Sequence, residues 1–319
     1  MKRFVVFLIL AAVAGGAWFW ERQNFAAPGP AQNYTVVMVQ PGDHVVTIAQ
    51  HLQAAGVVTN ADLFRIGLRI RGKQTGLKAG EYGFPAHASL ADVMNILVAG
   101  KSIEHKITAA EGLTSQMIAN IVESDNVLTG SAGPVPDEGT LLPETYLFTR
   151  GMTRAQMIAK MHEAQVKFLD EKWAARQPDL PVKTPEQAVI LASIVEKETG
   201  IPEERRHIAS VFENRLRLGM KLQSDPTIIY GITKGYPLGH GIRLSELTRV
   251  TPYNTYIIPG LPPTPICNPG KDAVAAVLDP EQSNDLYFVA TGHGGHVFTP
   301  SLAAHEQNVA KLRKLERTR

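Results

Sequence analysis

The chain has 319 residues, of which 44% are hydrophobic and 19% are charged, with 32 Lys and Arg against 30 Asp and Glu and a formal net charge of +2. This composition excludes wholesale disorder, and the length accommodates about two domains with cores of their own. The near balance of charge gives no signature of nucleic-acid binding. A single cysteine, Cys267, excludes a disulfide framework and cysteine-rich zinc modules.

Residues 4–20 form an uncharged apolar run, FVVFLILAAVAGGAWFW, which follows Lys2 and Arg3 and ends in an aromatic cluster. These features are typical of a membrane-spanning helix with its N-terminus inside the cell. We expect residues 1–22 to be a stub and anchor in the cytoplasmic (inner) membrane and residues 23–33 to be a linker, with the rest of the chain on the periplasmic side. The alternative is a cleaved signal peptide, because the run contains a small-x-small pattern.

Residues 34–102 predict a small α+β module. We expect a strand over 34–39, two short helices of which the second is capped by Asn60, a returning strand within 77–84, and a helix capped by Ser89. The string VQPGDHVVTIAQHL resembles the start of a LysM module, a family that binds polymers containing N-acetylglucosamine. A purely structural role is the alternative for this module.

Residues 103–319 predict a larger mixed domain, which places the whole chain in the α+β class. A helical frame includes a helix capped by Thr184 and a last helix over 302–315. The segment 223–269 is rich in Pro, Gly, Tyr and Asn, which favours ordered loops rather than long helices, and binding groups usually lie on such loops. A β-hairpin is expected over 286–298.

A candidate catalytic acid lies in the string LASIVEKETG. Leu191, Ile194 and Val195 recur at helical spacing and predict a buried face. Glu198 continues that face, so its carboxyl group should be desolvated and its pKa raised, as a general acid requires. Glu196 is rotated by roughly 200° from Glu198 on a helix and should face elsewhere. The alternative is a surface helix end with solvated glutamates.

Six strings occur in a fixed order along the chain: LLPETYLF, ASIVEKET, ASVFENRLRLGMKLQSDPTIIYG, TPYNTY, GLPPTPICNPG and LYFVATGHGGHVF. Together they resemble the membrane-anchored endolytic murein transglycosylase family, known as MltG or YceG-like. The resemblance implies that Glu198, the second glutamate of the Glu-Lys-Glu motif, is the catalytic acid. It also implies a glycan cleft lined by Gln223, Asp225, Tyr253, Asn254 and Tyr256. Glu144 and Tyr146 of the Pro-Glu-Thr-Tyr string, and Glu196 as an orienting or surface residue, are further substrate-binding candidates. Family members commonly have Asp where this chain has Glu144.

The resemblance implies a lyase that cleaves the MurNAc–GlcNAc bond within glycan strands and thereby limits the elongation of nascent strands. One glutamate serves as acid and then as base, and a 1,6-anhydro end forms without attacking water, cofactor or metal. The implied partners are peptidoglycan and the membrane. The resemblance also implies an association with peptidoglycan synthases, because the family works beside them. Two alternatives stay open: a glycoside hydrolase that uses Glu198 with Asp225, and a non-catalytic peptidoglycan-binding scaffold.

Neither the C-terminal histidines nor an arginine-rich segment of the sequence predicts a further binding site. His293, His296 and His305 lack a carboxylate that would complete a metal signature, so no metal site is expected. Four arginines between residues 205 and 217 are interleaved with glutamates, which favours a solvated helix face: Arg205, Arg206, Arg215 and Arg217.

Overall fold

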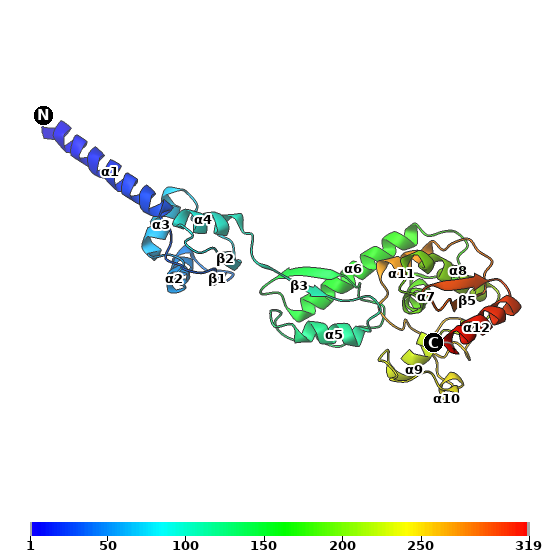
Figure 1. Cartoon of the computed structure of the whole chain (residues 1–319). Helices are drawn as coiled ribbons and strands as arrows, with labels where there is room; N and C mark the ends of the chain where they lie inside the picture. Colours follow the sequence, from blue (N-terminus) through cyan, green and yellow to red (C-terminus); the bar gives the residue numbers. More distant parts are fainter. Residues whose placement is uncertain (1, 318–319) are drawn as a thin grey trace. The chain divides into compact units, whose positions relative to one another are not determined.

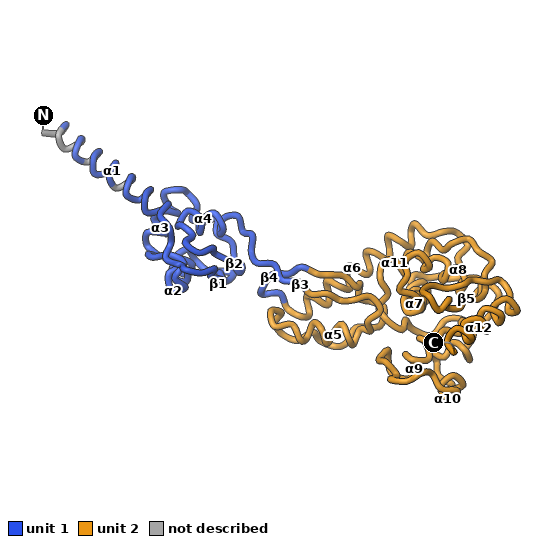
Figure 2. The backbone as a smooth tube through the Cα atoms, viewed as in Figure 1, with its two compact units in different colours: residues 1–106, 147–152 blue, residues 107–146, 153–319 orange. Residues whose placement is uncertain are grey.

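The computed structural model describes residues 2–317, and the chain divides into two compact units (Figure 2). The first unit comprises Met1–Lys106 and Leu147–Met152, and the second comprises Ile107–Tyr146 and Thr153–Arg319. The division falls inside strand β3 (Glu104–Thr108), which pairs with β4 (Thr145–Thr149), so both strands of this ribbon pass from one unit into the other.

The first unit follows the predicted order of strand, two helices, returning strand and helix. Its elements are α1 (Lys2–Ala26), β1 (Thr35–Val39), α2 (Val45–Ala54), α3 (Ala61–Ile70), β2 (Gly80–Phe84) and α4 (Leu90–Ala99), labelled in Figure 1. β1 and β2 pair antiparallel, with Thr35 opposite Phe84. The predicted caps are confirmed, because Asn60 accepts the Leu63 N–H at 2.9 Å and Ser89 forms a capping box.

The end of α1 belongs to the core of this unit. Residues 23–26 were expected in a linker, but they form the last turn of the helix. Phe25 is only 1% exposed, and a Cβ atom on Gly67 would lie 2.1 Å from its ring, so only glycine admits this packing. Arg71 lies 3.8 Å from the Phe25 ring centroid and forms an ion pair with Glu21. The helix is therefore fixed to α3 by apolar and ionic contacts together.

Among the described residues, no helix combines the length and the apolar character that crossing a bilayer requires.

The second unit is a helical frame that carries a β-hairpin. Its elements are α5 (Ser115–Ser124), α6 (Arg154–Ala174), α7 (Pro185–Glu198), the 3-10 turn η1 (Pro202–Glu204), α8 (Arg205–Arg217), α9 (Asp225–Thr233), α10 (Leu244–Leu247), α11 (Lys271–Leu278), β5 (Tyr287–Ala290), β6 (His296–Thr299) and α12 (Leu302–Arg317). α7 packs against α8 and α11 at the centre of the hydrophobic core. Thr184 caps α7 as predicted.

The segment 223–269, where ordered loops rather than long helices are expected, contains two short helices, α9 and α10, between its loops. Pro226 stands in the first turn of α9, where its missing N–H would have no helical partner in any case, so it does not break the helix. Thr227, Ile228 and Tyr230 are buried, and this packing supports a helix that the composition did not favour.

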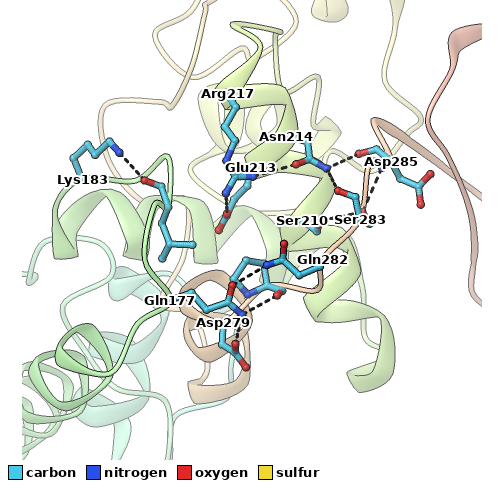
Figure 3. A network of polar contacts seen from close by, with 12 residues as sticks. Gln177, Lys183, Ser210, Glu213, Asn214, Arg217, Asp279, Gln282, Ser283 and Asp285 are labelled. Carbon is cyan, nitrogen blue, oxygen red and sulfur yellow. Dashed lines mark hydrogen bonds and ion pairs between the residues drawn. The ribbon is translucent and has the colours of Figure 1, made fainter.

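A polar network fixes the segment before β5 to α8 (Figure 3). The Asn214 side chain donates to the carbonyl oxygens of Ser283 at 2.9 Å and of Asp285 at 3.1 Å. The Ser210 and Ser283 hydroxyls lie 2.9 Å apart. Because Asp285 comes two residues before β5, these contacts set where the hairpin begins on the helical frame.

We predict that Phe25→Ala destabilises the first unit, whereas Phe19→Ala does not. Truncating a buried Phe costs about 3–5 kcal/mol through lost burial and the cavity left behind. Phe19 lies on the same helix but is 64% exposed, so it is the matched control. Chemical denaturation of the full-length chain measures both, and equal unfolding free energies for the two variants would contradict the docking of α1.

Candidate active site

Glu198 is the last residue of α7 and lines a pocket of about 470 Å³ in the second unit. The residues before it on the predicted stripe, Leu191, Ile194 and Val195, are fully buried. Glu198 itself is half-buried, so the stripe carries its carboxyl group from the core to the edge of the pocket. The sequence predicts that Glu198 continues the buried face of its helix, and the packing of α7 gives its side chain this direction.

The pocket walls come from segments that are far apart in the sequence. α8, the segment before α9, the β5–β6 hairpin and α12 all contribute. The lining residues are Glu198, Arg215, Leu222, Gln223, Asp225, Tyr256, Tyr287, Phe288, Val289, Ala290, His296, Leu302, His305 and Val309. Of the predicted cleft residues, the structure brings Gln223, Asp225 and Tyr256 together with Glu198.

The environment of Glu198 raises the pKa of its carboxyl group to about 7. Burial is the largest cause, because it penalises the charged form, and the negative charge of Asp225 acts in the same direction. The Ser224 hydroxyl, which donates to Glu198 Oε1, opposes this rise, as do His296 and Arg215. A carboxyl group with a pKa near neutrality can both donate and accept a proton at physiological pH.

Asp225 and Tyr256 form a polar pair on the pocket wall. The Tyr256 hydroxyl donates to Asp225 Oδ1 at 2.7 Å, and burial raises the pKa of Tyr256 above its usual value. Gln223 is exposed at the pocket and has a φ of 54°, in the left-handed region. Its backbone N–H donates to the carbonyl oxygen of Thr255, and this turn aims the following residues at Glu198.

Asn254 does not line the pocket, contrary to the expectation from the sequence. It is 1% exposed, and its side-chain N–H groups donate to the carbonyl oxygens of Leu247 at 2.9 Å and Arg249 at 2.8 Å. Its side-chain oxygen accepts the Tyr256 N–H at 3.0 Å. All of these partners are backbone groups, so Asn254 holds the loop that presents Tyr256.

Tyr253 also lies outside the pocket lining. Its hydroxyl lies 2.9 Å from Thr264 Oγ1, and its ring packs edge-on against Tyr230. The Lys234 ammonium lies 4.8 Å from the Tyr253 ring centroid. These contacts hold the 251–256 segment against α9.

Glu144, Tyr146 and Glu196 lie away from the pocket as well. Glu144 is exposed and forms an ion pair with Lys271 at 2.6 Å, which holds the pKa of Glu144 below its usual value. Tyr146 is buried and donates to the carbonyl oxygen of Leu142, and its pKa rises to about 12 through burial. Glu196 accepts the Gly270 N–H at 3.0 Å, so it braces the segment before α11.

The sequence interpretation missed Ser224, although it stands between the two predicted residues Gln223 and Asp225. It also placed Arg215 on a solvated face, which is wrong. Arg215 is buried, and its guanidinium donates to the carbonyl oxygens of Leu286 and Leu222 at 2.7 Å. The charge interleaving gave no sign of this, because long-range packing of β5 on α8 covers the residue.

Two of the singled-out histidines, His296 and His305, line the pocket. The carboxylate of Glu204 holds His296 at both its ring Nδ1, 2.7 Å away, and its backbone N–H. The His305 ring stacks on Tyr287. Within residues 2–317, no group of three or more His, Cys, Asp or Glu side chains is placed to hold a metal ion.

Comparison with known proteins places this architecture in a family. The YceG-like family model matches residues 37–311, and the chain belongs to this family. An endolytic murein transglycosylase of Streptococcus pneumoniae serotype 2 is 30% identical over 98% of this chain. One of Bacillus subtilis is 27% identical over 92% of this chain and 89% of its own length. The chain spans 65% of the length of the streptococcal relative.

A solved structure shows the same fold. The crystal structure of a putative yceG-like protein from Listeria monocytogenes is 26% identical and gives a TM-score of 0.54. The similarity covers 87% of this chain and 99% of the Listeria chain. The mixed α+β architecture with small two-stranded sheets is therefore that of the family.

We predict that Asn254→Ala lowers stability, whereas Gln223→Ala leaves it nearly unchanged. The first substitution strips three backbone groups of their buried partner, the Asn254 side chain, and each lost hydrogen bond costs about 0.5–1.5 kcal/mol. Gln223→Ala removes an exposed side chain and leaves a non-glycine residue at the same left-handed φ, so the backbone strain does not change. Thermal unfolding of both variants checks this, and a larger loss for Gln223→Ala would contradict it.

Proposed function

We propose that this chain is a peptidoglycan lytic transglycosylase that cleaves the MurNAc–GlcNAc bond within glycan strands. The observation that carries the proposal is a single desolvated carboxyl group, Glu198, with a pKa of about 7 in a polar pocket. Family membership and two relatives named endolytic murein transglycosylase support it. Among the described residues that line the pocket, the other carboxylate is Asp225, which is exposed and does not share this environment.

The proposed reaction has two proton transfers through Glu198. The protonated carboxyl group donates to the glycosidic oxygen while the C1–O bond breaks and the MurNAc ring gains oxocarbenium character. The resulting carboxylate accepts the proton of the MurNAc C6 hydroxyl, whose oxygen forms a bond to C1. The products are a free GlcNAc 4-hydroxyl end and a 1,6-anhydro-MurNAc end, and Glu198 is again protonated. No water is consumed.

Neighbouring groups suit a sugar substrate. The Gln223 amide can donate to and accept from sugar hydroxyls, and the Asp225–Tyr256 pair offers a second polar contact on the wall. Of the residues that the resemblance assigned to the cleft, these three are the substrate-binding groups that we retain. Glu144, Tyr146, Glu196, Tyr253 and Asn254 support the fold around them.

A glycoside hydrolase is the second candidate, because Asp225 lines the same pocket and influences the pKa of Glu198. In that reaction Asp225 would activate water or attack C1. Mass spectrometry of the digest separates the two, since a hydrolase leaves reducing-end MurNAc and a lyase leaves 1,6-anhydro ends. Products with reducing MurNAc ends alone would exclude the lyase.

We predict that Glu198→Gln abolishes release of 1,6-anhydro products from peptidoglycan while the protein stays folded. Glutamine keeps the shape of the side chain but cannot transfer the proton. Glu196→Gln is the matched control on the same helix, and it should retain measurable turnover because Glu196 contacts Gly270 outside the pocket. Chromatography of the digests with mass detection, together with circular dichroism, measures both properties.

Cleavage at near wild-type rate by Glu198→Gln would overturn the proposal. The proposal would also be overturned if Glu196→Gln were folded but inactive while Glu198→Gln remained active. The same digests test the scaffold alternative, because a non-catalytic protein gives equal glycan strand lengths with and without Glu198.

We also propose that residues 4–20 hold the protein in the cytoplasmic (inner) membrane as a single pass, with the N-terminus inside. What supports this is the apolar run itself and the exposure of large apolar side chains along it: Phe4, Leu8, Ile9, Val13, Trp18, Phe19 and Trp20. In a bacterial host, the full-length protein should resist carbonate extraction from membranes and retain its N-terminal sequence. A mature form that begins near Gly15 in the soluble periplasm would contradict this.

Two finer expectations accompany the proposal. We propose that the LysM-like module at 34–102 contacts glycan, supported by its resemblance and by the order of strand, two helices and returning strand. An association with peptidoglycan synthases rests on the family resemblance alone. A pull-down on purified peptidoglycan tests whether the LysM-like module contacts glycan. It compares the full-length Glu198→Gln protein with a variant that is altered on the exposed face of α3.

A further inference from the structure

Ser224 is the residue in direct hydrogen-bond contact with the candidate catalytic acid. It is 1% exposed, and its hydroxyl donates to Glu198 Oε1. It comes immediately before α9, so its backbone does not follow the helix and its side chain is free to turn toward Glu198. This buried hydroxyl therefore contacts the carboxyl group that transfers the proton, and its role is not limited to packing.

A closed ring of hydrogen bonds fixes the position of Ser224. The Thr227 hydroxyl donates to the Ser224 carbonyl oxygen at 2.6 Å, and the Ser224 backbone N–H donates to Thr255 Oγ1 at 2.9 Å. The Thr227 and Thr255 hydroxyl oxygens lie 2.9 Å apart. Since the Thr227 proton is already committed to Ser224, the Thr255 hydroxyl donates in this last contact.

This ring leaves the Ser224 hydroxyl available to Glu198. All polar backbone groups of Ser224 that face Thr227 and Thr255 are used within the ring, which leaves the Ser224 hydroxyl for Glu198. A hydroxyl that donates to a carboxylate favours the ionised form. The bond therefore works against burial, which favours the protonated form of Glu198.

We propose that Ser224 is a positioning residue that holds the Glu198 carboxyl group in the pocket and stabilises its carboxylate form. This inference rests on the proposed function, in which Glu198 acts as acid and then as base. A carboxyl group that burial alone controlled would hold its proton more tightly at neutral pH and would donate it less readily. The Ser224 hydroxyl stabilises the carboxylate that forms, which favours the first transfer, and it holds this carboxylate in place for the second transfer.

The other groups around Glu198 set the background for a pH measurement. Asp225 raises the pKa of Glu198, and His296 and Arg215 lower it. Arg215 and His296 come from α8 and β6, whereas Asp225 follows Ser224 directly in the chain, and none of the three is hydrogen-bonded to the Ser224 hydroxyl in the described part of the chain. A change in the Glu198 pKa in Ser224→Ala that Ser224→Thr reverses can therefore be assigned to that hydroxyl.

The test compares Ser224→Ala with Ser210→Ala in the full-length protein. Ser210 is also buried, but its hydroxyl contacts Ser283 and no pocket residue, so Ser210→Ala is the matched control. The first proton transfer requires protonated Glu198, so on the alkaline limb of the pH–activity profile the activity falls as pH rises through the pKa of Glu198. Ser224→Ala should move this alkaline limb upward by about one pH unit and reduce kcat by roughly tenfold. Ser210→Ala should leave the limb in place.

A second readout does not depend on turnover. The carboxyl 13C resonance of Glu198, assigned by its absence in Glu198→Gln, should titrate at higher pH in Ser224→Ala than in the wild type. Ser224→Thr, which keeps a hydroxyl, should restore the wild-type titration.

An unchanged pH profile and an unchanged carboxyl titration in folded Ser224→Ala would overturn the role of Ser224. That result is distinct from failure of the proposed function, which is marked by activity of Glu198→Gln. A lower kcat without a shift in either titration would assign Ser224 to scaffolding and would also overturn the proposal.

Discussion

Burial of the apolar face of α7 is the constraint on which the candidate site depends. Leu191, Ile194 and Val195 are fully buried against α8 and α11, and this packing fixes the rotation of the helix about its axis. Once the rotation is fixed, Glu198 must leave the core at the pocket and Glu196 must point elsewhere. The raised pKa of Glu198 is then a consequence of packing, because the same face that stabilises the fold removes water from the carboxyl group.

The pocket becomes a site only because distant segments meet at the end of α7. The hairpin wall is held in place by polar contacts of α8 with the segment before β5 and by the Glu204–His296 pair. The wall that carries Gln223, Asp225 and Tyr256 is held by the hydroxyl ring around Ser224 and by the buried Asn254 amide. These bonds are buried or nearly so, where an unpaired group would be costly, and this cost keeps the walls in one arrangement.

The first unit shows how a terminal helix can be built into a domain. The Phe25 ring packs directly on the backbone of Gly67, where any side chain would clash with it. The Glu21–Arg71 ion pair also holds the last turns of α1 against α3. Because the last turn of α1 is packed in the core of this unit, the helix cannot rotate independently of the rest of the unit. The orientation of the module therefore follows the orientation of α1.

The sequence by itself determined the local elements and the catalytic candidate. Helical spacing and capping residues such as Asn60, Ser89 and Thr184 defined most helices, since these signals act over one or two turns. The spacing of Glu198 from the apolar residues of its own helix sufficed to predict which way it faces. Motifs in a fixed order indicated the family, which the comparisons confirmed.

Only the tertiary structure decided which neighbours reach Glu198. Gln223, Asp225, Tyr253 and Asn254 carry similar signals in the sequence, yet two line the pocket and two support its loops. The burial of Arg215 and the hydrogen bond of Ser224 were likewise invisible. Whether a polar side chain faces a pocket or the backbone is set by contacts between segments far apart in the chain. Composition and periodicity report only on nearest neighbours along the chain, so they cannot resolve that choice.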